Sequence, residues 1–214
     1  MPLEFETDKF PFVQAKVFKE VTGKRNVRLI VIHSMEAPEK GDTAENVARF
    51  FQNPPNPASA HLCIDNNSIV QCVLDNNIAA AAPGANQDGI HLELAGFAKQ
   101  TRDEWLDDYG LQLLNNAANA AAQYALKYDI PVRRLTNDEL ADGETKGLVS
   151  HSQVSAVFKK STHTDPGEGF PWDFFLEHVE QQRADRLAKL TSTDAGTSAA
   201  GAQLGAGTVH RRFT

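Results

Sequence analysis

Histidine and carboxylate side chains gather in two short, turn-rich stretches in the second half of the chain. One stretch holds His151, and the other holds His163 and Asp165 directly before Pro-Gly. A third imidazole, His33, closes a long apolar run. Imidazole nitrogens and carboxylate oxygens are ligands that suit zinc. The sequence therefore predicts that His33, His151 and Asp165 hold one zinc ion and leave a fourth position open for water, as catalytic sites do.

Each of these side chains also has a plainer interpretation, which the sequence alone leaves open. His33 could simply cap the end of a strand, and Asp165 could be an ordinary turn residue before Pro-Gly. His163 could replace Asp165 as the third ligand, in which case Asp165 would orient His163 through a hydrogen bond. We favour the set of His33, His151 and Asp165, because each member then has partners that can share one ion.

Length and charge exclude some classes of protein. At 214 residues and 41% hydrophobic, the chain is long enough for one sizeable globular domain. A net charge of −7 and a pI near 5.5 argue against a nucleic-acid partner held by phosphate contacts. The first eight residues are acidic rather than signal-like, and no apolar run approaches the ~20 residues of a membrane span. We therefore expect no membrane insertion. We also expect the protein to be made in a cytoplasm and to stay there unless something else releases it.

The two cysteines flank the expected turn of a β-hairpin. With residues 66–67 as an Asn-Asn turn, Cys63 faces Val70 and His61 faces Cys72. The cysteines are then diagonal neighbours, which are poorly placed for a disulfide. We expect free thiols in a reducing compartment.

Hydrophobic patterns predict strands that alternate with helices. The run that ends at His33 is apolar throughout apart from Arg28, as a central strand should be. In the last full-length strand, His91 and Glu93 share one face and apolar side chains occupy the other. Strands are expected at residues 27–33, 60–64, 69–73 and 89–94, with a short one at 132–135.

Three helices are expected between and after these strands. Asp42 as N-cap and Glu45 three residues on form a capping-box pattern for the first helix, which buries Val47, Phe50 and Phe51. A long second helix spans residues 103–128, with an inner stripe of Leu111, Leu114, Ala118, Ala121, Ala122 and Ala125. A third helix has proline 171 at its first position and fades over residues 180–189.

This order of elements predicts an α/β fold with one main domain. We place the catalytic domain at residues 25–185, after an N-terminal extension over residues 1–24. Residues 186–214 are rich in Ser, Thr, Ala and Gly without a core-forming pattern, so we expect a flexible low-complexity tail.

With these residues in order, the chain resembles the type 2 N-acetylmuramoyl-L-alanine amidases. That family includes phage endolysins, bacterial recycling amidases and peptidoglycan recognition proteins. The resemblance covers roughly residues 25–178 and implies a mixed central β-sheet flanked by helices, with zinc in a groove above the sheet. It rests on Ile-His-Ser at 32–34, Ser-Ala-His at 59–61, Gly-Ile-His-Leu-Glu-Leu at 89–94, Val-Ser-His-Ser at 149–152, Thr-Asp-Pro-Gly at 164–167 and the aromatic Trp172.

The resemblance also implies roles for individual residues. The zinc ligands of the family fall on His33, His151 and Asp165, and its general base falls on Glu93. Where many members carry lysine two residues before the aspartate, this chain has His163, which would stabilise the oxyanion when protonated. His61 lies near the groove in the family and is a candidate substrate contact.

The implied substrate is peptidoglycan or a soluble muropeptide, cut between N-acetylmuramic acid and L-alanine. We favour a phage-type endolysin, made in the host cytoplasm and acting on the cell wall after release. A cytoplasmic recycling amidase also needs no signal peptide, so it stays an alternative. A non-catalytic muropeptide-binding module is disfavoured because all three expected ligands are present.

Overall fold

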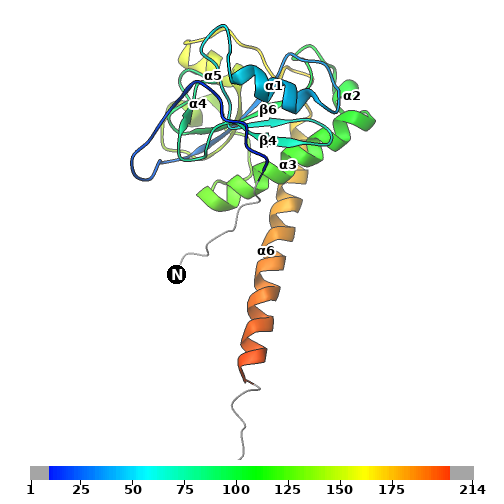
Figure 1. Cartoon of the computed structure of the whole chain (residues 1–214). Coiled ribbons are helices and arrows are strands. Elements are labelled where there is room, and N and C mark those ends of the chain that lie inside the picture. Colours follow the sequence, from blue (N-terminus) through cyan, green and yellow to red (C-terminus); the bar gives the residue numbers. More distant parts are fainter. Residues whose placement is uncertain (1–9, 203–214) are drawn as a thin grey trace, which may run out of the picture.

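The computed structural model describes the backbone of residues 10–202 and the side chains of residues 10–190. Its centre is a five-stranded sheet in the order β4-β3-β6-β2-β7 (Figure 1). Neighbouring strands are parallel except for the antiparallel pair of β3 and β4. The predicted mixed central sheet is therefore confirmed. Its strands are β2 (Leu29–Ser34), β3 (Leu62–Ile64), β4 (Ile69–Gln71), β6 (Gly89–Leu94) and β7 (Gly147–Ser150).

Helices cover both faces of this sheet, as the sequence predicts. On one face, α3 (Asp108–Tyr128) and α6 (Trp172–Ala202) pack against side chains such as Ile30 and Leu92. On the other face, α1 (Thr43–Phe51) lies over β3 and β4, while α4 (Asn137–Ala141) and α5 (His151–Phe158) lie near Leu29 and Val31. The sheet between the two groups on this second face carries the polar site.

Strand β2 lies inside the sheet, between β6 and β7, and every one of its residues is buried. Its alternate side chains point to opposite faces, so Ile30 and Ile32 enter the core with α3 and α6. His33 lies on the other face, in register with Glu93 of β6. The parallel register thus brings two expected site residues side by side.

The first predicted helix forms as α1, but the predicted capping box between Asp42 and Glu45 does not form. Asp42 holds the N-cap position without a side-chain cap hydrogen bond. The helix is capped instead from the hairpin, because Asp65 Oδ2 accepts from the Ala44 amide at 3.0 Å. A buried carboxylate 21 residues further along the chain therefore replaces the local cap.

Two predicted buried faces need correction. On α1, Phe50 is 49% exposed and Val47 is half-buried, so only Phe51 of the three expected residues is buried. On α3, Leu111 is 41% exposed and Leu113 is fully buried in its place. The other residues of the predicted inner stripe, Leu114, Ala118, Ala121, Ala122 and Ala125, are buried as expected.

The long second helix is interrupted near its start. A short helix α2 (Arg102–Trp105) begins with a capping box between Thr101 and Glu104 and ends at Trp105. Helix α3 then begins again, because Asp107 accepts a hydrogen bond from the Gly110 amide at 2.8 Å. A side chain at Gly110 would clash with the Trp105 carbonyl, so the tight junction requires glycine there. The prediction of one unbroken helix from residue 103 is wrong.

The predicted hairpin forms around the Asn-Asn turn, with Cys63 opposite Val70. Both cysteines are free and buried, with a distance of 3.7 Å between their sulfur atoms. The hairpin strands are shorter than predicted. Residues 132–135 contribute only an isolated bridge between Arg134 and Leu148, so the short strand expected there is not formed.

The structure describes only part of the expected N-terminal extension and of the expected C-terminal tail. Of the expected extension, residues 1–9 lie outside the described residues, and the next segment pairs β1 (Phe18–Lys19) with β5 (Ile78–Ala79). Helix α6 continues through Ala202, so its expected fading before residue 190 is wrong (Figure 1). Residues 203–214 of the expected tail lie outside the described residues, and the division into domains stays a prediction. Among the described helices, none is long and apolar enough to cross a membrane.

Candidate metal and catalytic site

Three buried side chains meet on the face of the sheet that carries the polar site. His33 lies near the end of β2, His151 opens α5 directly after β7, and Asp165 lies in the loop before α6. The Nδ1 atoms of His33 and His151 are 3.1 Å apart. Asp165 Oδ2 lies 3.2 Å from His33 Nδ1 and 3.3 Å from His151 Nδ1. Among the described residues, this is the group that could hold a metal ion.

The triangle of donor atoms fits zinc. Ligands about 2.0–2.1 Å from a tetrahedral zinc ion lie roughly 3.3 Å from one another. With Asp165 Oδ2 as the oxygen donor, the three sides found here are 3.1, 3.2 and 3.3 Å. Two nitrogens and one carboxylate oxygen are also a common zinc donor set. The residues present therefore suit the ion that the sequence predicts.

Burial and hydrogen bonding favour the protonation states that metal ligands need. Burial lowers the pKa of His33, which favours the neutral imidazole. Burial alone would raise the pKa of Asp165, but hydrogen bonds from His151 and His33 outweigh burial and lower it. Asp165 therefore stays ionised beside neutral His33, as metal binding requires.

The loop that carries Asp165 is held on both sides. The Ser152 amide donates to the Asp165 carbonyl at 2.9 Å, which ties the loop to the first turn of α5. Two residues on, Gly167 has a positive φ of 92°, and a side chain there would clash with the Ala98 carbonyl. The carboxylate is thus positioned by backbone contacts from two separate segments.

Glu93 lies at the edge of the triangle. Its Oε1 atom is 3.8 Å from His33 Nδ1, and its side chain is 16% exposed. Its Oε2 atom is buried and has no hydrogen-bond partner among the described residues. Burial, and then the neighbouring carboxylates of Asp165 and Glu36, raise the pKa of Glu93 well above its ordinary value. Glu93 is therefore a carboxyl group that can take up a proton close to the metal-binding triangle.

His163 lies outside the triangle but touches it. Its ring stacks on that of His151 with a centroid distance of 4.2 Å, and its Nδ1 is 3.3 Å from Asp165 Oδ1. Its side chain is 63% exposed. The geometry therefore favours Asp165 over His163 as the third member of a ligand set.

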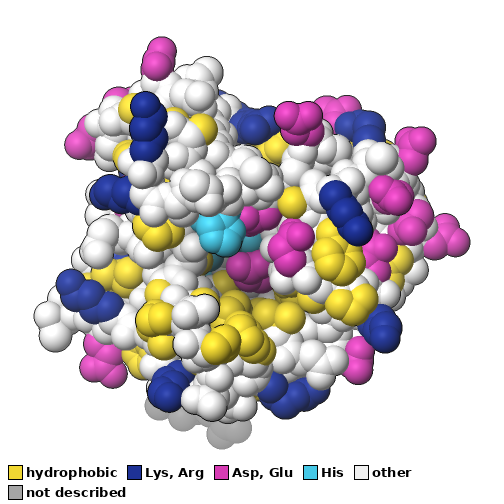
Figure 2. All heavy atoms as spheres, turned by 90° about the horizontal axis from the view of Figure 1, so that it is seen from above, with side chains coloured by type: hydrophobic (Ala, Val, Ile, Leu, Met, Phe, Trp, Pro, Cys, Tyr) yellow, Lys and Arg dark blue, Asp and Glu magenta, His cyan; other side chains and the backbone are white. Residues whose placement is uncertain are grey.

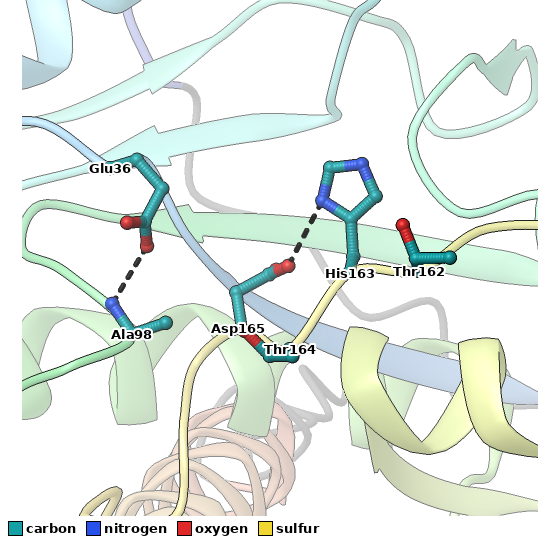
Figure 3. Close-up of a pocket in the computed structure, with 6 residues that line it drawn as sticks. All are labelled: Glu36, Ala98, Thr162, His163, Thr164 and Asp165. Atoms are coloured by element: carbon teal, nitrogen blue, oxygen red, sulfur yellow. Dashed lines mark hydrogen bonds and ion pairs between the residues drawn. The ribbon is translucent and has the colours of Figure 1, made fainter.

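A cavity of about 290 Å³ opens beside these residues. Figure 3 shows His163 and Asp165 on one side of it, with Glu36 facing them from the other. Figure 2 shows the same region as a hollow in which a histidine and several acidic side chains gather, with hydrophobic side chains along one rim. The lining residues are Glu36, Ala98, Thr162, His163, Thr164 and Asp165.

His61 is the candidate substrate contact from the sequence. Its side chain is fully buried, and its Nε2 atom is 3.2 Å from the Asn77 carbonyl. Burial, and then the adjacent guanidinium of Arg25, lower the pKa of His61 to about 3. In this arrangement His61 supports the strand beneath the site by accepting from the His91 amide, and its contact with substrate stays a prediction.

Two residues near the site were not assigned a role from the sequence. Glu36 has a positive φ of 50°, and its Oε1 accepts from Ser34 Oγ at 2.8 Å and from the Ala98 amide at 2.7 Å. His91 is fully buried, 3.0 Å from the Nε2 atom of His33. The predicted alternation of residues 89–94, which puts His91 on the same face as Glu93, is confirmed.

Solved structures with the same fold include a hydrolase, an AmpD derivative and an endolysin amidase. A Staphylococcus aureus hydrolase, AmiA in complex with its ligand, matches with a TM-score of 0.64 at 18% identity, over 86% of this chain and 88% of that one. A selenomethionine derivative of AmpD matches with a TM-score of 0.56 at 17% identity, over 79% and 94%. The endolysin and N-acetylmuramoyl-L-alanine amidase LysCS of Clostridium intestinale matches with a TM-score of 0.52 at 16% identity, over 82% and 97%. At these identities the likeness shows the fold.

Sequence comparison identifies the family directly. No curated protein sequence matches the chain significantly. A family model described as N-acetylmuramoyl-L-alanine amidase matches residues 23–168, which is more than half of the chain and contains the whole triangle of His33, His151 and Asp165. The chain therefore belongs to the N-acetylmuramoyl-L-alanine amidase family.

Proposed function

We propose that this protein is a zinc-dependent hydrolase that cleaves the amide bond between N-acetylmuramic acid and the L-alanine of peptidoglycan. The observation that carries the proposal is the buried triangle of His33, His151 and Asp165, whose 3.1–3.3 Å sides suit one zinc ion. The family match supports the substrate class. A non-catalytic binding module would not need to keep all three donors in one triangle.

The roles of the side chains follow from their positions. A zinc ion held by His33, His151 and Asp165 would supply a Lewis acid, which activates water and polarises the scissile carbonyl. Glu93, a buried carboxyl group with a raised pKa, would take a proton from the attacking water and return it to the departing amine. His163, exposed at the cavity, would donate a hydrogen bond to the oxyanion that forms on the carbonyl oxygen.

We further propose that the enzyme acts on the intact cell wall, as a phage-type endolysin. The site opens on the surface at a hollow, where a polymer can reach it (Figure 2). Solved endolysin catalytic structures such as LysCS share the fold and support this assignment. Such an enzyme would be made in the host cytoplasm and would reach the wall only after release.

The experiment compares two substrates with the purified full-length chain. Intact sacculi and soluble anhydromuropeptides are digested, and new amino termini are identified by labelling. We expect new L-alanine termini from sacculi, and their loss after chelation with recovery on adding zinc. Faster cleavage of the soluble muropeptides would favour the recycling amidase, and termini other than L-alanine would refute the proposed bond.

Matched variants test the residues behind this activity. His151→Ala should lose both zinc and activity, because two remaining ligands bind an ion far more weakly. His178→Ala removes a histidine whose contacts with the Phe174 carbonyl and ring lie within its own helix α6, away from the triangle, and this variant should retain both. Equal zinc contents in the two variants would contradict the proposed site.

A further inference from the structure

A further histidine, His91, is fully buried directly behind the metal-binding triangle. His91 of β6 is in register with Val31 of β2, so it lies on the same face as His33 and two residues behind Glu93. The distance between His91 Nδ1 and His33 Nε2 is 3.0 Å. His91 is not a member of the triangle, and the catalytic roles proposed above do not use it.

When both imidazoles are neutral, the hydrogen positions on this pair have two consistent arrangements. In the first, His33 carries its proton on Nε2 and donates it to His91 Nδ1, which leaves a lone pair on His33 Nδ1. In the second, His91 donates from Nδ1 to His33 Nε2, and His33 Nδ1 then carries a proton that it can donate to Asp165 Oδ2, 3.2 Å away. Only the first arrangement lets His33 bind a cation, and it requires His91 to act as an acceptor.

A histidine suits both arrangements, whereas other common partners suit one. A carboxylate or a backbone carbonyl only accepts, so it would hold His33 in the first arrangement alone. His91 can accept when a cation is bound and donate when it is not. His33 therefore keeps a hydrogen bond at Nε2 in either state.

The remaining nitrogen of His91 argues against a purely structural role. His91 Nε2 is buried and has no hydrogen-bond partner among the described residues. Burying a polar group without a partner costs free energy that an apolar side chain of similar size would avoid. The contact through Nδ1 is therefore the feature that distinguishes histidine from leucine at this position.

The surrounding residues hold His91 in place. Its backbone amide donates to His61 Nδ1 at 3.0 Å, and His61 Nε2 in turn faces the Asn77 carbonyl. Arg25 Nη2 donates to the Gly89 carbonyl at 2.8 Å, next to the His91 ring. A Cβ on Gly89 would lie 3.0 Å from His91 Nε2, so glycine leaves room for the imidazole.

We propose that His91 is a positioning residue for the metal centre, which accepts the Nε2 proton of His33 and thereby keeps the Nδ1 lone pair of His33 free for the cation. The inference rests on the proposed function in taking that cation to be zinc. It predicts that His91 changes the affinity for zinc without being required for the fold.

The test compares His91→Leu with His91→Asn in the full-length chain. Leucine has a similar volume but cannot accept a hydrogen bond, whereas asparagine offers either an oxygen or an amide nitrogen where the imidazole has Nδ1. Zinc affinity is measured by competition with a chromogenic chelator, and the thermal midpoint of the metal-free protein is measured separately. We expect His91→Leu to bind zinc ~10–100-fold more weakly, as for other residues that orient metal-binding histidines.

The conservative variant and the metal-free midpoints separate positioning from packing. His91→Asn should recover zinc affinity to within about threefold of wild type, and both variants should unfold within roughly 4 °C of wild type without metal. Wild-type affinity in His91→Leu would overturn the inference, as would weak binding in both variants with a matching loss of metal-free stability. A wild-type chain that binds no zinc would refute the proposed function, and the wild-type titration alone reveals that case.

Discussion

Acid should destabilise this protein through His61, and the structure gives the size of the effect. Burial, and then Arg25, hold the pKa of His61 at about 3 in the folded chain. An unfolded histidine titrates near ~6.5. Between these values the unfolded chain binds the extra proton and the folded chain does not. Stability is therefore complete above pH ~6.5 and falls as the pH drops from ~6.5 towards ~3.

The magnitude follows from the same two pKa values. Each pH unit within this window costs about 1.4 kcal/mol, so His61 can remove at most roughly 5 kcal/mol of folding free energy. At pH ~4.5, two units below the unfolded pKa, the expected loss is about 2.7 kcal/mol. For a chain of this length that loss lowers the thermal midpoint by about 5–10 °C.

Urea titrations at about pH 7.5 and pH 4.5 measure this loss, with chelator present so that zinc release adds no pH dependence of its own. His61→Gln keeps a donor and an acceptor at the tip of the side chain but cannot titrate. Its free energy of unfolding should fall by about 2.7 kcal/mol less than that of wild type between the two pH values. Equal falls in the two proteins would show that His61 is not a buried neutral histidine, and the reasoning would fail.

Three further predictions concern the site and the loop that carries Asp165. Glu93→Gln keeps the shape of the side chain and removes its basicity, so bound zinc should stay while release of L-alanine termini slows by roughly 10²–10⁴; zinc loss would make Glu93 a ligand or its support. His163→Ala should also keep zinc and lose roughly 10²–10³ in turnover, with His163→Lys restoring much of it; if His163→Ala loses zinc and Asp165→Ala retains it, those two residues exchange roles. Gly167→Ala should lower the thermal midpoint more than Gly143→Ala, because both have positive φ but only Gly167 lies against a neighbouring backbone carbonyl; equal shifts would contradict that difference.

The strands and the central sheet could be predicted because their pattern is local. Residues 89–94 alternate strictly, and the run before His33 is apolar on both faces, so each strand is recognisable without knowledge of its neighbours. The first residues of the helices were harder to predict from the sequence. The Thr101–Glu104 capping box is visible in the sequence and was missed, whereas the cap of α1 comes from Asp65 and depends on the folded hairpin.

The candidate site was also predictable only in part from local sequence patterns. Motif order predicted that His33, His151 and Asp165 gather, and the structure brings them together, although their roles as ligands stay predictions. Alternation also predicts which face a side chain occupies. It does not predict how deeply that side chain is buried, because burial depends on which other segments pack over the face. The family resemblance places His61 near the groove, whereas in the structure His61 is fully buried and lies 3.4 Å from Arg25 Nη1.

The matched register of β2 and β6 has a consequence for how the gene can change. His33 pairs with Glu93 and Ile32 pairs with Leu92, so residues of the candidate site and core residues alternate on both strands. Inserting or deleting a single codon within either strand would move every following side chain to the opposite face. Histidine would then enter the core while isoleucine faced the cavity. Length variation among descendants of this gene should therefore be confined to the connecting loops, such as residues 53–59, and should be absent from these two strands.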